Sequence, residues 1–396
     1  MHDQTKGTFS KLRYLWVEFT VNNMRHRIIL ALGTLLLFSF SFSVSAQQNI
    51  FANKAILAQV KLGIDKTYNS EFDQAEAIFR MIGDETPGHP VGPLLFGLLY
   101  YYKYSPLTPE SEGAGPFVAT LEKAISLSGK ILDKDKNNVE IMAIDMISRA
   151  LLNMYYVDNG NSFKAIPEVM PIYRYVVRGF KLKDQFNEFY FTTGLYNYYR
   201  EAYPEAHPVY KPVASLLQPG NKAEGLRELH YAADSCIFLK NEALIFLKII
   251  YLNYENDPVK ASRCMQSLHD RYPNNLDFMA GCAETYLFSK EYEKARPFLY
   301  LIFTRGRKNK GALMKGFILK GMYEEKAVAD LPTAEQNYLT GLQMSEDFGS
   351  PVDAYRAYAC FGLSRIYKIE GKLKESKEYR KKAESLARYK YFSRLD

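Results

Sequence analysis

The stretch from residue 261 to residue 295 reads ASRCMQSLHDRYPNNLDFMAGCAETYLFSKEYEKA, and it contains the clearest repeated pattern of the chain. Two predicted helices flank the turn Arg271-Tyr272-Pro273-Asn274-Asn275. Proline cannot continue a helix and asparagine favours caps and turns, so this segment predicts a break between them. Ala261 and Ala295 stand 34 residues apart, which indicates that the helical unit repeats.

The same register extends outward along the chain. Ala75 and Pro87 repeat the 12-residue step from Ala261 to Pro273. Small residues at such positions let two helices approach closely, and an aromatic residue such as Phe72 packs across the turn between them. The clearest copies are predicted at residues 56–90, 242–275, 276–309 and 357–390. Less regular copies lie between them, with insertions at 105–116 and 201–221.

This pattern resembles the tetratricopeptide repeat (TPR), in which a small residue marks the helix contact, an aromatic fills the gap, and alanine, an aromatic and proline follow on the second helix. The resemblance is carried by Gly63, Phe79, Ala283 and Tyr292 together with the alanines and prolines above. It implies an all-α fold, a right-handed superhelical solenoid of about eight helix-turn-helix hairpins over residues 47–396. Each hairpin leaves an apolar face that only the next hairpin can cover.

The chain begins with a predicted targeting segment at residues 24–46. Met24 to Arg27 is basic, Ile28 to Phe38 is almost entirely apolar, and Val44-Ser45-Ala46 has the small residues that signal peptidase needs. We expect cleavage after Ala46 and export to the periplasm, with residues 1–23 as an upstream extension ahead of a start at Met24. The alternative is a membrane anchor formed by an uncleaved segment from Ile28 to Ala46.

The charge and the motifs exclude several classes of function. The chain of 396 residues carries a net charge of +7, and residues 1–46 hold five Lys or Arg and two Asp or Glu, so the remainder carries +4. This balance is too mild to indicate a nucleic-acid-binding protein. No His-Glu-x-x-His, Gly-x-Ser-x-Gly or phosphate-binding loop occurs in the sequence. We therefore expect no enzyme activity, no catalytic residues and no cofactor.

Two metal-site patterns fail their spacing tests. Asp133 and Asp135 mimic the start of a calcium loop, but Asn138 replaces the glycine and Ile144 the bidentate glutamate that such a loop requires. Cys264, His269 and Cys282 lack a fourth zinc ligand. We predict no metal site, and we leave open whether Cys264 and Cys282 form a disulfide.

The resemblance to the TPR family also places a binding surface. In that family the first helix of each pair lines a concave groove. Its inward positions in the fourth, fifth and sixth copies correspond here to Glu188, Phe191, Tyr198, Tyr199, Phe246, Asn253, Tyr254, Asp277, Glu284 and Phe288. Aromatic rings with polar tips anchor extended peptides or sugars well.

These observations predict an exported, non-enzymatic scaffold that binds protein partners of the cell envelope in an aromatic groove. It would contact the membrane only through its signal peptide or those partners. The alternative is a periplasmic module that binds a small glycan or peptide, with the insertion at 201–221 as a lid.

A basic turn at Arg305, Arg307, Lys308 and Lys310 is either solvated or a contact for an acidic envelope component such as lipid headgroups.

Overall fold

The structure is a computed structural model, and it describes residues 49–387. The predicted signal peptide and upstream extension lie outside these residues. Gln48–Asp396 forms one compact unit with a continuous apolar core. Among the described residues, no helix has both the length and the apolar character needed to cross a membrane.

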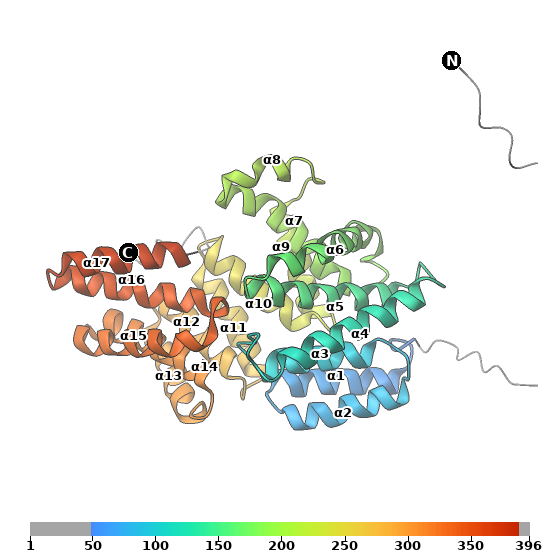
Figure 1. Ribbon diagram of the computed structural model, residues 1–396, viewed down its shortest axis with the longest axis horizontal. Helices are drawn as coiled ribbons and strands as arrows, with labels where there is room; N and C mark the ends of the chain where they lie inside the picture. The colour runs from blue at the N-terminus through green and yellow to red at the C-terminus, as the bar shows by residue number, and fades with distance from the viewer. Residues whose placement is uncertain (1–48, 388–396) are drawn as a thin grey trace, which may run out of the picture. The chain divides into compact units, whose positions relative to one another are not determined.

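The described residues contain sixteen helices of 13 to 21 residues, one four-residue helix (α8) and no β-strand (Figure 1). Consecutive helices pack in sequential pairs, which confirms the predicted all-α, TPR-like solenoid of eight hairpins. The pairs are α1 (Lys54–Tyr68) with α2 (Phe72–Glu85), α3 (Val91–Lys103) with α4 (Ala114–Leu132), α5 (Val139–Asp158) with α6 (Ser162–Leu182), α7 (Glu188–Ala206) with α9 (Lys222–Ser235), α10 (Lys240–Asn253) with α11 (Pro258–Arg271), α12 (Leu276–Phe288) with α13 (Tyr292–Arg305), α14 (Lys310–Tyr323) with α15 (Leu331–Ser345), and α16 (Asp353–Ile369) with α17 (Leu373–Leu386).

Short polar residues set where many helices begin. The side chains of Asn53, Asn138, Asn275 and Asn309 each accept a backbone N–H in the first turn of a first helix. Such caps satisfy donors that have no partner inside the helix. The turns within six hairpins share a residue with positive φ, namely Ser70, Gly160, Asn256, Lys290, Ala329 and Gly371. The hairpin turn is therefore a repeated local structure, although its sequence varies.

Two glycines let the paired helices α7 and α9 approach closely. A Cβ atom placed on Gly225 would lie 2.6 Å from the backbone nitrogen of Tyr198 and 2.7 Å from the carbonyl oxygen of Gly194. Real Cβ atoms do not approach backbone atoms so closely, so position 225 requires glycine. The small residues Gly194 and Gly225 thus allow this hairpin to close.

The helix α6 contains two prolines, Pro167 and Pro171. It begins at Ser162 and continues through both of them to Leu182. Each proline lacks the N–H that would bond the carbonyl four residues earlier. Phe163 and Pro167 are exposed to solvent, so water can satisfy those carbonyl groups.

Candidate functional site

Side chains of the first helices meet one another across the molecule. The Tyr68 hydroxyl of α1 donates a 2.8 Å hydrogen bond to Glu242 Oε1 of α10, and the Tyr102 hydroxyl of α3 donates to the same oxygen. Burial raises the pKa of Glu242, and the two tyrosine hydroxyls oppose that rise. The first two hairpins are therefore joined to the fifth, and we call the surface where these helices meet the inner face.

A second polar contact extends the inner face to α12 and α14. Ser105 Oγ, after α3, donates to Asp277 Oδ2 at 2.8 Å, and Lys315 Nζ of α14 lies 2.6 Å from Asp277 Oδ1. Burial raises the pKa of the Asp277 carboxyl, but the positive charge and hydrogen bond of Lys315 and the Ser105 bond outweigh it and lower the pKa. The Lys315 ammonium also lies 5.7 Å from the ring centroid of Tyr355.

A third contact joins α10, α12 and α16. The Lys248 ammonium lies 2.5 Å from Glu284 Oε2, and the Tyr358 hydroxyl donates to Glu284 Oε1 at 2.8 Å. The side chain of Glu284 is buried and that of Lys248 nearly so. The Phe288 ring packs edge-on against Tyr358 at a centroid distance of 5.2 Å. The inner carboxylates are thus balanced by lysine or tyrosine partners.

Three rings form what we call the tyrosine cluster: Tyr198 and Tyr199 on α7, and Tyr254 directly after α10. Their centroids lie 5.4 to 6.2 Å apart with nearly perpendicular planes. Tyr198 is fully buried and donates to Glu255 Oε1, whereas Tyr199 and Tyr254 are partly exposed. Edge-to-face packing fixes the ring orientations, so the exposed parts of this cluster are held in place.

The remaining predicted groove residues have different environments. Glu188 is buried at the start of α7, where its carboxylate accepts the backbone N–H groups of Ile237, Phe238 and Leu239. Phe191 is buried against the partly exposed Phe246, with centroids 5.5 Å apart. Asn253 is also partly exposed. The structure brings most of the predicted residues into contact with other first helices. Glu188 instead holds the turn before α10 against the start of α7.

Sequence reasoning missed several residues of the inner face, and all of them except Lys248 lie outside copies four to six. Tyr68, Tyr102, Lys248, Lys315 and Tyr358 all contribute to it through the contacts above. Their local sequence carries little signal, because a single tyrosine or lysine is common in any helix of this chain, which has 31 tyrosines.

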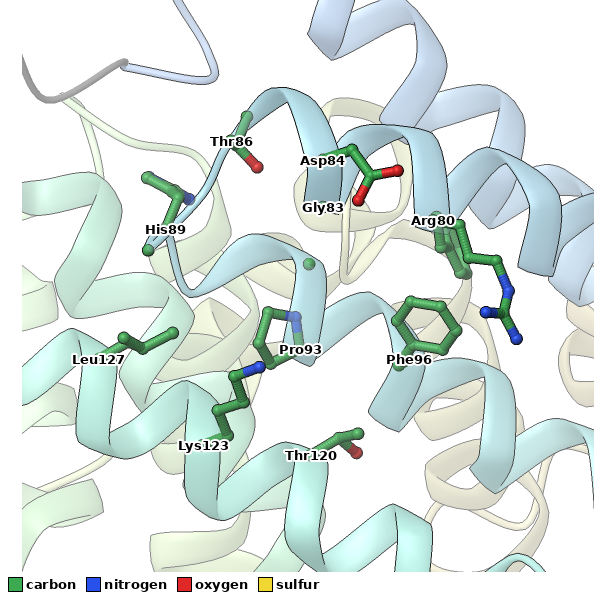
Figure 2. A pocket seen from close by; sticks show the side chains of 13 residues that line it. Arg80, Gly83, Asp84, Thr86, His89, Pro93, Phe96, Thr120, Lys123 and Leu127 are labelled. Carbon is green, nitrogen blue, oxygen red and sulfur yellow. The ribbon is translucent and has the colours of Figure 1, made fainter. Parts of the chain in front are cut away.

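A cavity of about 410 Å³ lies away from the inner face, between α2, α3 and α4 (Figure 2). Phe96 and Pro93 contribute apolar surface, and Arg80, Asp84 and Lys123 lie around it. Arg80 is already paired with Glu76 at 2.6 Å. These side chains include no nucleophile held by a base, so the cavity offers space but no evident chemistry.

A second cavity of about 380 Å³ lies where the first hairpin meets the fourth and fifth. Its lining includes Asp65, whose carboxylate accepts a 2.6 Å hydrogen bond from the Tyr272 hydroxyl, and Asn241, which accepts one from Arg271 at 3.1 Å. Lys61 and Lys240 complete its charged wall. The cavity therefore lies at a polar interface between hairpins that are distant in the sequence.

The insertion predicted at 201–221 packs mainly against the helix that precedes it. It contains the end of α7, a 3₁₀ turn (η1, Pro208–Tyr210) and α8 (Lys211–Ala214), and the principal contacts of η1 and α8 are with α7 and each other. The Tyr196 hydroxyl donates to the Gln218 carbonyl at 2.6 Å. These contacts hold the insertion against α7, and its role as a lid stays a prediction.

The described residues offer no cluster of three or more His, Cys, Asp or Glu side chains suited to a metal ion. The four cysteines of the chain all lie in the described part, where each is a buried free thiol. Cys264 and Cys282 are among them, and burial raises the pKa of both thiols.

No family model and no curated protein sequence matches the chain. Among solved structures, it is similar to yeast Tom70, with a TM-score of 0.37 and 15% identity over 77% of this chain and 62% of that one. It is also similar to a monomeric mutant of IFIT1 with m7Gppp-AAAA, with a TM-score of 0.33 and 13% identity over 80% of this chain and 77% of that one. The chain thus spans less than two thirds of the Tom70 chain, and at these TM-scores neither likeness carries a functional argument.

Proposed function

We propose that this protein is an exported, non-enzymatic scaffold that binds an extended segment of an envelope protein on its inner face. The observation that carries the proposal is the tyrosine cluster, in which the buried ring of Tyr198 holds two partly exposed rings, Tyr199 and Tyr254. Tyrosine offers a large apolar surface and a polar tip, which suits both the side chains and the backbone of a bound peptide.

The rigidity of the surrounding face supports the same function. The inner carboxylates Glu242, Asp277 and Glu284 already have partners within the fold. Their side chains do not need to be ordered when a partner arrives, so less of the binding free energy is lost to ordering. The accessible anchors are then Tyr199, Phe246, Asn253, Tyr254 and Phe288, which are partly exposed on three first helices.

Export rests on the sequence of residues 24–46, which has the basic, apolar and small-residue segments of a signal peptide. In an envelope location the scaffold would meet exported proteins before or while they assemble.

Site-specific photo-crosslinking in intact cells tests the proposal. A photoreactive phenylalanine analogue replaces Tyr199 or Tyr254, and the matched control carries it at Tyr300, an exposed position on α13. We expect discrete crosslinks to exported proteins from positions 199 and 254 and none of these from position 300. A Phe246→Ser change should weaken them, because it removes another partly exposed ring from α10.

Tyr198 is unsuitable for this experiment, since it is fully buried and its change would damage the hairpin. Identical crosslinks from positions 199 and 300 would contradict the proposal. So would crosslinks to cytoplasmic proteins alone, or a folded protein whose inner face captures nothing.

A further inference from the structure

The outer side of α6 carries an apolar surface that nothing in the described structure covers. Phe163, Ile166 and Met170 have 87%, 61% and 56% of their surface exposed, and Val169 and Val177 are exposed as well. Ten of the nineteen large apolar side chains that are exposed in the described part of the chain fall between residues 163 and 217. A concentration of this kind marks an interaction surface.

The spacing of these residues places them along one side of the helix. Phe163, Ile166, Met170 and Val177 follow one another at intervals of three, four and seven residues, which aligns them in a stripe. We call these four residues the α6 stripe, and the exposed Val169 lies beside it. A different side of α6, with Ala165, Val176 and Gly179, is buried against neighbouring helices. The stripe is therefore not part of the repeat packing.

Positive charges border the stripe. Arg174 follows Met170 by four residues and Lys181 follows Val177 by four, so each lies beside a stripe residue on the helix surface. Both are exposed, and neither has an acidic partner among the described residues. The acidic residue of α6, Glu168, is already bound to Arg149 at 2.6 Å. A partner that suits the stripe has an apolar interior to receive its side chains and an anionic surface to meet the bordering cations.

The insertion after α7 has the same character. Val209, Leu216 and Leu217 are exposed there beside the exposed Lys211. Because α6 and α7 are packed and joined by a short loop, the insertion emerges at the end where α6 begins. In Figure 1, α8 projects beyond the end of α7.

We propose that α6 and the insertion around α8 lie on the surface of a membrane that contains anionic lipid. The stripe would enter the boundary between headgroups and acyl chains, and the bordering cations would gain from the negative surface potential. Both apolar segments are exposed, and the cavities of about 380 to 490 Å³ lie at other helices. An exposed apolar stripe with a basic border, outside any cavity, fits a lipid surface better than it fits a second protein groove.

A second copy of the chain fits the stripe less well. In a symmetric dimer each surface patch meets its own copy, so Arg174 and Lys181 would face the same cations of the other protomer. This inference concerns a surface distinct from the inner face, and it does not depend on the scaffold function.

Vesicle flotation tests the proposal with residues 48–396, which contain the whole described core. The vesicles contain phosphatidylcholine alone or with about one third phosphatidylglycerol. We expect binding only to the anionic vesicles, and weaker binding at high salt. Arg174→Gln with Lys181→Gln should lower the partition coefficient roughly 25-fold, since each cation near an anionic surface contributes about fivefold.

Phe163→Ser with Met170→Ser should lower the partition coefficient at least roughly tenfold, because both side chains would enter the boundary region. Their exposure means that the variant should melt like the parent protein. The matched controls change exposed residues elsewhere: Arg307→Gln with Lys308→Gln between α13 and α14, and Tyr300→Ser on α13. The controls should bind within about twofold of the parent.

Equal binding to neutral and anionic vesicles would overturn the proposal, as would α6 variants that behave like the controls. Concentration-dependent dimers that the apolar variant abolishes would assign the stripe to a second copy instead. Absence of vesicle binding, with capture of an acidic protein through the stripe, would assign it to a protein partner.

Discussion

Replacing Gly225 with alanine should separate α7 from α9. The new methyl group would lie 2.6 Å from the Tyr198 backbone nitrogen and 2.7 Å from the Gly194 carbonyl oxygen. Both are backbone atoms that cannot rotate away, so the helices must move apart by nearly 1 Å. Such overpacking costs about 1–3 kcal/mol or more, while alanine regains up to about 1 kcal/mol of helix propensity. We expect a net loss of about 2 kcal/mol.

Urea unfolding followed by circular dichroism measures this loss. The matched control is Gly129→Ala in α4, where a Cβ would meet nothing within 4 Å. The control should gain up to about 1 kcal/mol in its free energy of unfolding, because only helix propensity changes. The two alanine variants thus have opposite expected signs. If Gly225→Ala were as stable as Gly129→Ala, the close approach of α7 and α9 would be refuted.

Two further predictions concern buried carboxylates. Burial raises the pKa of Glu188 to about 7, because its effect exceeds that of the three backbone N–H bonds, which lower the pKa. Between roughly pH 4.5 and 7 the Glu188 carboxyl is therefore protonated in the folded state and ionised in the unfolded chain. The free energy of unfolding should therefore fall by up to about 3 kcal/mol as the pH rises through this window. The Glu188→Gln variant, measured by denaturation at several pH values, should lack this part of the pH dependence. Glu284→Gln should cost about 3 kcal/mol by leaving the largely buried Lys248 side chain without its charge partner. The double variant with Lys248→Met should recover part of the loss in a double-mutant cycle, and no recovery would mean that the ion pair is not the cause.

The hairpins could be predicted from the sequence because their determinants are local. Small residues such as Gly63 and Ala283, and the break at Pro273, lie within a few residues of the contacts and turns that they produce. The positive-φ turn residues could not be predicted as readily. Lys290 and Ala329 adopt this conformation without the glycine that usually signals it, because the packed helices on either side fix the turn.

The inner face depends on distances along the chain that no local pattern reports. Tyr68 and Glu242 are 174 residues apart, and Tyr272 and Asp65 are 207 apart. Their meeting depends on the small rotation from each hairpin to the next, summed over four hairpins. The family resemblance therefore identified candidate inward positions but not their partners. Glu188 illustrates the limit, since its three N–H donors belong to the turn before α10.

The α6 stripe could not be predicted from the sequence, for a different reason. An apolar helix face in a repeat protein is ordinarily buried by the next repeat, so periodicity alone cannot distinguish a packed face from an exposed one. The exposure of Phe163, Ile166 and Met170 in the folded structure shows that the stripe faces solvent.

The contacts between distant hairpins also change how stability is distributed. In an open solenoid each repeat touches only its neighbours, so its ends can unfold separately. Here α1 and α3 donate hydrogen bonds to Glu242 of α10, and Tyr272 bonds Asp65 of α1. Unfolding the first hairpin would remove the Tyr68 hydroxyl, one of the two donors to the buried carboxylate of Glu242, which is costly in a low-dielectric site. The first and fifth hairpins are thus energetically linked, and the rigid inner face that we propose as the binding surface is a consequence of that link.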